Sequence, residues 1–156
     1  MDELQVLHAK PADMDDWIAL RLQLWPGDHE AEFREEVADI LRQPQRYCAF
    51  IARDAQGTAL GLAEAAVRSD YVNGCEGSPV LFLEGIYVSE QARRQGIAGR
   101  LVRAVQAWGI ERGCVDFASD AALDNHASHA LHRALGFVET ERVVFFRKSL
   151  HDAPKD

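Results

Sequence analysis

The sequence has few cysteines, no long apolar run and no surplus of positive charge, and each shortage excludes a class of protein. Cys48, Cys75 and Cys114 are odd in number and lack CxxC spacing, which predicts reduced thiols rather than disulfides or a structural zinc site. No apolar run approaches the roughly 18 residues of a membrane span. The N-terminal residues 1–5 lack the basic and apolar regions of a secretory signal. We therefore expect a cytoplasmic protein that does not bind a membrane.

The charge balance is acidic. Asp and Glu number 25 against 17 Lys and Arg, which gives a formal net charge of −8. Binding of nucleic acid requires a basic footprint, so we expect no nucleic-acid partner. The acidic surplus has two interpretations: ordinary solubility, which composition alone favours, or an acidic cleft that attracts a cationic ligand.

At 156 residues, the chain is long enough for one domain with a two-layer core. We predict a single domain over residues 1–150 and a frayed tail over 151–156. Apolar periodicity and turn signals predict a mixed α/β (α+β) sheet with helices on both faces. The predicted strands are residues 4–8, 47–53, 59–67, 80–88, 115–119, 138–140 and 142–148. The predicted helices are 14–24 with Asp13 as its cap, 30–42, 96–112, and one from a cap at Asp124 or Asn125 to Gly136.

The stretch from residue 80 to residue 100 is the most informative part of the sequence. An apolar strand runs into a turn with Arg93 and Arg94, followed by Gly96 and Ala98 at the start of a helix. Phosphate binds where backbone N–H groups, the helix dipole and charged donors converge, and small residues allow its close approach. The turn is neither a P-loop nor a GxGxxG motif. It predicts a phosphate-bearing cofactor, although two surface arginines before an ordinary helix would give the same pattern.

Glu84 is the other unusual feature of this stretch, because it interrupts an otherwise apolar strand. A buried carboxylate without a partner is costly. Glu84 therefore either points into a wet cleft, which we favour, or pairs with a basic side chain such as an arginine. Asp120, after a short strand, is on spacing alone more often a turn acid. Trp25, before Pro26 and Gly27, is more often a core residue at a helix end.

Three motifs resemble the GNAT acetyltransferase superfamily: Leu83–Val88, the Arg93–Ala98 turn, and Leu131–Phe137. The resemblance implies the GNAT fold, with a mixed, mostly antiparallel sheet, and acetyl-CoA as cosubstrate. It further implies that the pantetheine arm lies along the backbone of Ile86, Tyr87 and Val88. The turn would hold the pyrophosphate, and Asn125 would face the cofactor from the opposite side. The turn residues implied in cofactor binding are Arg93, Arg94, Gln95, Gly96, Ile97, Ala98 and Gly99.

His132 departs from the superfamily pattern. Many members carry a tyrosine four residues before the Gly-Phe pair, where it protonates the departing CoA thiolate, and here that position is His132. A protonated histidine or water would have to serve instead. A thiol pKa near 8.5 makes the thiolate a tolerable leaving group, so the acid matters less. His126, His129 and His132 are not spaced as HExxH, and we expect no metal.

Five blocks resemble, more narrowly, the bacterial aminoglycoside 6′-N-acetyltransferases: residues 23–27, 70–75, 82–86, 118–120 and 140–143. The resemblance implies acetyl transfer to the 6′-amine in a ternary complex, antibiotic resistance, and an acidic cleft for the cationic drug. We expect Glu84 or Asp120 to accept the amine proton. We also expect a homodimer, because related enzymes often dimerise. The residues implied to line the cleft are Trp25, Asp70, Tyr71, Glu84, Asp120 and Glu141.

Two other functions stay open at this point. One is an acetyltransferase of the same fold that acts on a polyamine or a protein amine. The other is an acyl-CoA-binding module without catalysis.

Overall fold

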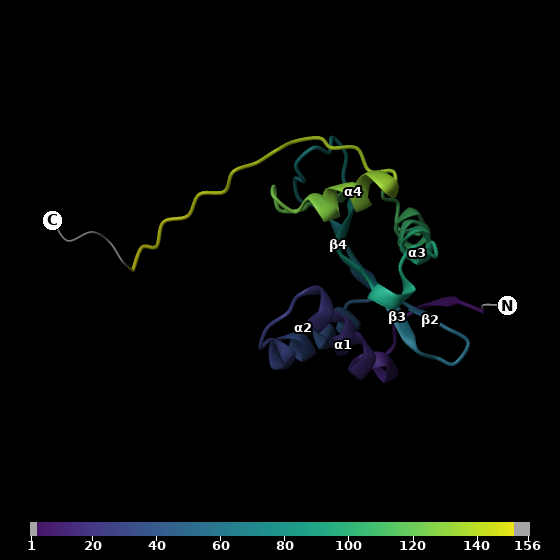
Figure 1. Cartoon of the computed structure of the whole chain (residues 1–156). Helices are drawn as coiled ribbons and strands as arrows, with labels where there is room; N and C mark the ends of the chain where they lie inside the picture. Colours follow the sequence, from purple (N-terminus) through teal and green to yellow (C-terminus); the bar gives the residue numbers. More distant parts are fainter. Residues whose placement is uncertain (1–2, 152–156) are drawn as a thin grey trace.

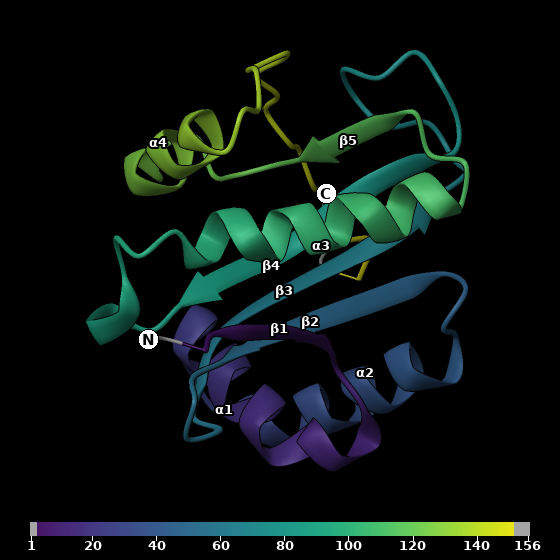
Figure 2. The ribbon, with the colours of Figure 1, turned by 90° about the vertical axis from the view of Figure 1, so that its right-hand side faces the viewer.

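The computed structural model of the protein describes residues 3–151 and has one five-stranded sheet in the order β1-β2-β3-β4-β5 (Figures 1 and 2). Strands β1 to β4 run antiparallel to their neighbours, and β5 is parallel to β4. The predicted mixed, mostly antiparallel sheet is confirmed. The strands are β1 (Gln5–His8), β2 (Tyr47–Arg53), β3 (Ala59–Arg68), β4 (Val80–Val88) and β5 (Asp116–Ser119).

Helices cover both faces of the sheet, as predicted. They are α1 (Met14–Leu24), α2 (Glu30–Arg42), α3 (Ile97–Glu111) and α4 (His126–Ala134), with short 3-10 turns η1 (Pro11–Asp13) and η2 (Glu90–Ala92). Alternate residues of a strand face opposite sides. In β2, Ile51 packs with Trp17 of α1 and Val37 of α2, whereas Ala52 packs with the apolar stripe of α3, which includes Leu101. Figure 2 shows α3 lying along the sheet, with α1 and α2 below it.

Asp13 does not act as the predicted cap of α1, because its carboxylate has other donors. It accepts hydrogen bonds from the backbone N–H of Lys10 at 2.8 Å and from Nη2 of Arg53 at 2.7 Å. A 3-10 turn precedes the helix and takes the place of a side-chain cap.

The C-terminal strands predicted at 138–140 and 142–148 are wrong for the described chain, in which the last regular element is α4. A strand requires a neighbour for its backbone hydrogen bonds. The chain after α4 instead runs extended and away from the body (Figure 1), so it meets no other strand between residues 3 and 151. Val144, Phe145 and Phe146 are 71%, 86% and 93% exposed. In the predicted tail, residues 152–156 lie outside the described residues.

None of the helices in the described chain is long and apolar enough to cross a membrane. All three cysteines are free thiols, in agreement with the prediction from their spacing. Burial raises the pKa of Cys48 to about 12, so this thiol is protonated at neutral pH.

Candidate active site

The site forms where β4 and β5 separate. The two strands pair from Val80 and Asp116 as far as Leu83 and Ser119, and β4 continues without β5 beyond that point. Along Ile86–Val88, β4 pairs only with β3 in the described chain. Its other edge is left with backbone groups that can hydrogen-bond an extended ligand in the manner of an added strand.

Glu84 lies in a β-bulge at this point of separation. Ala65 pairs with Leu83, but the next pair is Glu64 with Gly85, so Glu84 has no partner in the register. A bulge re-aims a side chain and is common beside active sites. The Glu84 side chain is 36% exposed, and its Oε1 lies 3.0 Å from Nη2 of Arg68. The two alternatives left open for Glu84 therefore coexist: it is accessible, and it has an arginine partner.

Trp25 packs directly over the glycine beside Glu84. A Cβ at Gly85 would lie 2.7 Å from Cη2 of Trp25, so only glycine leaves room for the indole. The Arg21 guanidinium lies 5.5 Å from the centroid of the same ring. Trp25 and Glu84 share a cavity of about 520 Å³ with two acids of α2, Glu36 and Asp39. Trp25 is thus partly buried, and it forms an aromatic wall beside several carboxylates.

A buried ion pair supports this wall. Nε and Nη2 of Arg21 donate to the two carboxylate oxygens of Glu64 at 2.7 and 2.6 Å, and Nε1 of Trp17 donates to Glu64 at 3.0 Å. Nη1 of Arg21 reaches Glu36 at 2.5 Å. Burial lowers the pKa of Arg21, but the hydrogen bonds and charges of Glu64 and Glu36 outweigh it and raise that pKa. This pair was not predicted from the sequence, although Glu64 interrupts an apolar strand just as Glu84 does.

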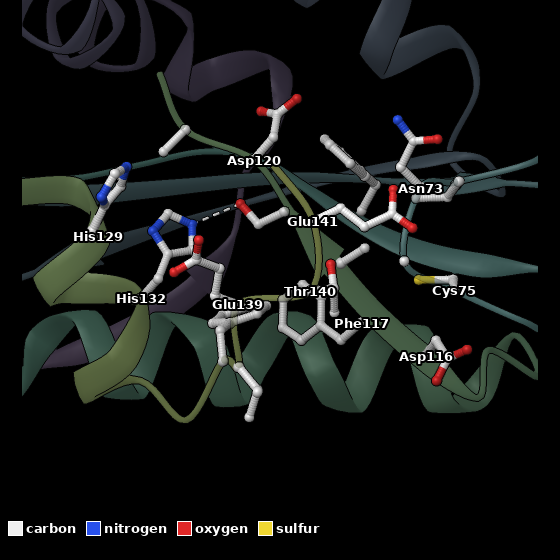
Figure 3. A pocket seen from close by; sticks show the side chains of 18 of the residues that line it. Asn73, Cys75, Asp116, Phe117, Asp120, His129, His132, Glu139, Thr140 and Glu141 are labelled. Carbon is white, nitrogen blue, oxygen red and sulfur yellow. Dashed lines mark hydrogen bonds between the residues drawn. The ribbon is translucent and has the colours of Figure 1, made fainter. Parts of the chain in front are cut away.

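A larger cleft of about 1050 Å³ lies between β5, the loop after β3, α4 and the C-terminal segment. Tyr71, Asp120 and Glu141, all expected at the acceptor site, line this cleft, and Figure 3 shows Asp120 and Glu141 beside it. Asp70 lines neither cavity. Arg68 lines the larger cleft and its partner Glu84 the smaller one, so their ion pair stands between the two.

Glu139 adds a further carboxylate to the larger cleft. Nε of Arg142 donates to Glu139 at 2.5 Å. This hydrogen bond, the charge of Arg142 and the nearby Arg133 hold the pKa of Glu139 below its usual range. Glu139 therefore stays ionised at neutral pH.

The turn expected to bind phosphate has a backbone suited to anions. Arg94 and Gly96 have positive φ angles of 66° and 76°, and Gly96 is the N-cap of α3 without a side-chain cap. The first amides of a helix have no intrahelical acceptor, and left-handed backbone before a helix N-terminus favours anion binding. Arg94 and Gln95 are exposed. Nε of Arg93 donates to the carbonyl of Val88 at 3.0 Å, which ties the turn to the end of β4.

His132 and Asn125, both expected near the cofactor, have intramolecular partners. Oδ1 of Asn125 accepts from the backbone N–H of Ser128 at 3.1 Å and thereby caps α4. Nε2 of His132 lies 2.7 Å from Oγ of Ser119, an interaction drawn as a dashed line in Figure 3. Nδ1 of His132 lies 2.7 Å from the carbonyl oxygen of Ser128. Ser119 was not predicted from the sequence, because nothing in the pattern shows that β5 and α4 bring it to His132.

The histidines of α4 do not form a metal centre in the described chain. Residues 3–151 contain no group of three or more His, Cys, Asp or Glu side chains arranged to hold a metal ion. The rings of His126 and His129 are 5.6 Å apart, and Nε2 of His129 interacts with the carbonyl of Ala122 at 2.9 Å.

The chain has clear similarity to known proteins. The sequence profile of the acetyltransferase (GNAT) family matches residues 14–137. Aminoglycoside N(6′)-acetyltransferase type 1 of Serratia marcescens is 53% identical, over 88% of this chain and 94% of that protein. The structure of AAC(6′)-Iy in complex with the bisubstrate analog CoA-S-monomethyl-acetylneamine superposes with a TM-score of 0.89 at 44% identity, over 94% of this chain and 99% of that one. The crystal structure of AAC(6′)-Ih from Acinetobacter baumannii gives 0.90 at 45% identity, with the same coverage.

Proposed function

Since the chain belongs to the acetyltransferase (GNAT) family and, within it, to the type 1 aminoglycoside N(6′)-acetyltransferases, we propose that it transfers the acetyl group of acetyl-CoA to the 6′-amine of aminoglycosides. The observation that carries this proposal is the joint presence of a free β4 edge, an anion-binding turn and two adjoining cavities rich in carboxylates. The product would be an antibiotic with one positive charge fewer, so the activity would confer resistance.

The cofactor is proposed to bind along β4 and the turn after it. The backbone of Ile86–Val88 would pair with the pantetheine arm, and the open amides at the start of α3 would hold the pyrophosphate. Arg94 is exposed and would add a charged donor. Nε of Arg93 donates to the carbonyl of Val88, and this hydrogen bond would orient the turn. The solved complex of AAC(6′)-Iy with a CoA-containing analog supports CoA binding by this fold.

The acceptor is proposed to lie across the two cavities. An aminoglycoside is a polycation, and the walls offer the carboxylates of Glu84, Asp120 and Glu141 with the rings of Trp25 and Tyr71. The net charge of −8 adds long-range attraction for a cation. Asp70 lines neither cavity and has no part in this proposal.

The reaction requires a neutral amine. Deprotonating a lysine-like amine of pKa about 10.4 costs roughly 4–5 kcal/mol at pH 7, and less for a more acidic sugar amine. Glu84 or Asp120 would accept that proton, directly or through water, as the amine attacks the thioester. A backbone N–H near Ile86–Val88 would polarise the carbonyl. Both substrates meet in one ternary complex, and no covalent enzyme intermediate is involved.

The test is CoA-thiol release with two aminoglycosides that differ only in an amine or a hydroxyl at the 6′ position. We expect steady turnover with the amine and none above background with the hydroxyl compound. A linear polyamine and a lysine peptide serve as rival acceptors in the same assay. Turnover that is equal with both drugs, or faster with the polyamine or the peptide, would contradict the proposal.

We also propose that the protein is a homodimer in the cytoplasm. Residues 143–148 are four apolar residues followed by two basic ones, and they stand exposed, while β5 at the end of the sheet has only one neighbour in the described chain. A second copy offers the same free β5 edge, so the C-terminal segment of each copy would add a strand to the sheet of the other. The three free cysteines favour a reducing compartment.

The mass in solution tests the dimer. Light scattering should give twice the chain mass of 17.4 kDa for the natural chain. The double variant Phe145→Asp/Phe146→Asp should shift the protein towards a single copy, whereas Leu150→Asp, beyond the proposed strand, should not. A natural chain that remains monomeric at tens of micromolar would contradict the proposal.

A further inference from the structure

We propose that Ser119 and His132 form a proton relay that protonates the CoA thiolate as it leaves. Ser119 would donate the proton, and His132 would replace it. The inference rests on the acetyl transfer proposed above and adds a group to it. Glu84 and Asp120 are the candidate proton acceptors of that reaction. The proton donor for the departing sulfur was left between a protonated histidine and water, and the relay supplies it.

Ser119 lies at the point where acetyl transfer would take place. It is the last residue of β5 and pairs with Leu83, and the residues that follow this pair on the two strands are Asp120 and Glu84. The free edge of β4 begins immediately beyond. A thioester that follows that edge towards the two acids would bring its sulfur to the opening between the strands, beside the Ser119 hydroxyl.

The hydrogen bonds of His132 indicate which nitrogen carries the proton. Nδ1 lies 2.7 Å from the carbonyl oxygen of Ser128, which can only accept, and 3.3 Å from the Ser128 hydroxyl, which can donate or accept. The shorter contact, to the carbonyl, favours a hydrogen on Nδ1. Nε2, 2.7 Å from Oγ of Ser119, is then the nitrogen that gains and loses a proton. When Nε2 is protonated it donates to Ser119, and the serine hydroxyl turns its own hydrogen elsewhere. One acceptor already within reach is the carbonyl of Leu83, at 3.3 Å.

The relay acts as the leaving group departs. The tetrahedral intermediate collapses, the C–S bond breaks, and its electron pair goes to sulfur. The Ser119 hydroxyl gives its proton to the thiolate, and Nε2–H of His132 gives its proton to the serine oxygen. The products are CoA thiol, an intact serine and a neutral His132 that keeps its Nδ1–H. The amine proton leaves by the carboxylate route, and solvent protonates His132 for the next turnover.

The relay predicts a pH dependence of defined direction. Imidazole is the side chain that ordinarily changes charge between pH 5 and 8. Because the protonated ring is the active form, kcat should fall towards high pH. If His132 acted as a base instead, kcat would fall towards low pH. Other titratable or charged groups line the same cleft and will shape the profile: Arg68, Cys75, Asp116, Asp120, His129, Arg133, Glu139, Glu141 and Arg142.

A purely structural role is the rival explanation, because the Ser119–His132 contact also ties β5 to α4. Three variants separate the two. Ser119→Ala removes the donor, Ser119→Thr keeps a hydroxyl, and His132→Gln keeps a polar side chain that cannot titrate. His129→Gln is the matched control, since it lies on the same helix and lines the same cleft without touching Ser119.

The experiment measures kcat and KM between pH 5.5 and 9 for each variant, with thermal melting to check folding. We expect Ser119→Ala to lower kcat about 10- to 100-fold, at or below the lower limit for general acid catalysis because a thiolate leaves readily. KM for acetyl-CoA should stay within about twofold, since the relay acts on the leaving group rather than on binding. Ser119→Thr should regain most of the activity. His132→Gln should lose the fall in kcat at high pH, and His129→Gln should keep it.

Three results would overturn the relay: unchanged kcat in Ser119→Ala, the same high-pH fall in His132→Gln as in the natural enzyme, or a natural enzyme that loses kcat at low pH only. If Ser119→Ala does not fold, Ser119→Thr and the His132→Gln profile still decide the question. A natural enzyme that transfers no acetyl group to either test drug would refute the proposed function instead. If the natural enzyme is active, and Ser119→Ala and His132→Gln behave as it does, only the relay would be refuted.

Discussion

The glutamates of two arginine–glutamate pairs lie on adjacent strands of the sheet, and the two pairs differ in their burial and in their hydrogen bonds. Glu64 of β3 and Arg21 of α1 have side chains that are 4% and 5% exposed and joined by two hydrogen bonds, with a third from Trp17. Glu84 of β4 and Arg68 of β3 are each 36% exposed and share one contact of 3.0 Å. Glu64 pairs with Gly85, so the two acids flank the same bulge.

The difference shows which acid supports the fold and which is available to a ligand. Glu64 has its donors supplied by the protein, and a buried, satisfied carboxylate has little capacity left for chemistry. Glu84 can exchange its single arginine contact for a substrate ammonium or a water at little cost. The bulge therefore places a structural acid and an accessible acid next to each other.

The largest effect should follow from breaking the buried pair. Arg21→Met leaves Glu64 charged without its main donor, and removing one partner of a buried pair costs about 3–5 kcal/mol of unfolding free energy. Urea denaturation measures this loss. The double variant Arg21→Met/Glu64→Leu should recover much of it, because the uncompensated charge is gone. A loss below about 1 kcal/mol in the single variant would mean that the pair carries little of the fold.

Replacing the accessible acid should affect turnover instead. Glu84→Gln keeps the shape and a contact to Arg68 but cannot accept a proton. We expect kcat to fall about 100-fold, which corresponds to roughly 2.7 kcal/mol of barrier, while the unfolding free energy changes by less than about 1 kcal/mol. Unchanged kcat would remove Glu84 as the base and leave Asp120.

Gly85→Ala tests the aromatic wall formed by Trp25, which stands between the two arginine–glutamate pairs. The added Cβ would meet Trp25 at 2.7 Å, so the indole must shift, at a cost of about 1–3 kcal/mol of unfolding free energy. We expect KM for the aminoglycoside to rise and KM for acetyl-CoA to stay nearly constant. Equal increases in the two KM values would argue against Trp25 as an acceptor wall.

Arg68→Gln should give the smallest change in stability. The two side chains of its ion pair are each 36% exposed, so losing the pair should alter the unfolding free energy by less than about 1 kcal/mol. Removing a positive charge from the cleft should lower KM for the cationic drug, and the gain should shrink as salt is added. A large loss of stability would place this pair in the same class as Arg21 and Glu64.

The sequence was a good guide where structure depends on local pattern. The periodicity of α3, the arginine turn and Gly96 all predict local backbone geometry, and the structure agrees with them. The sequence also marked Glu84 correctly as unusual. It could not separate Glu84 from Glu64, because the donors of Glu64 come from α1, more than 40 residues away in sequence. The same limit hid Ser119, whose partner His132 lies on a different element.

The C-terminal segment shows a different limit. Val143, Val144, Phe145 and Phe146 have the composition of a strand, and the prediction of a strand rested on that alone. Strand formation also requires pairing with a neighbouring edge, and this segment pairs with none in the described chain. The composition indicates that these residues favour a strand. It does not show whether a strand edge is available for them to pair with.

The most direct test of the account compares Glu64→Gln with Glu84→Gln in the same two assays, urea unfolding and CoA-thiol release with a 6′-amine drug. We predict opposite effects. Glu64→Gln should lose about 2 kcal/mol or more of unfolding free energy but keep kcat within a few fold in its folded fraction, whereas Glu84→Gln should stay stable and lose about 100-fold in kcat. If the two variants lose stability and turnover in equal measure, the division between a structural and an accessible acid is wrong.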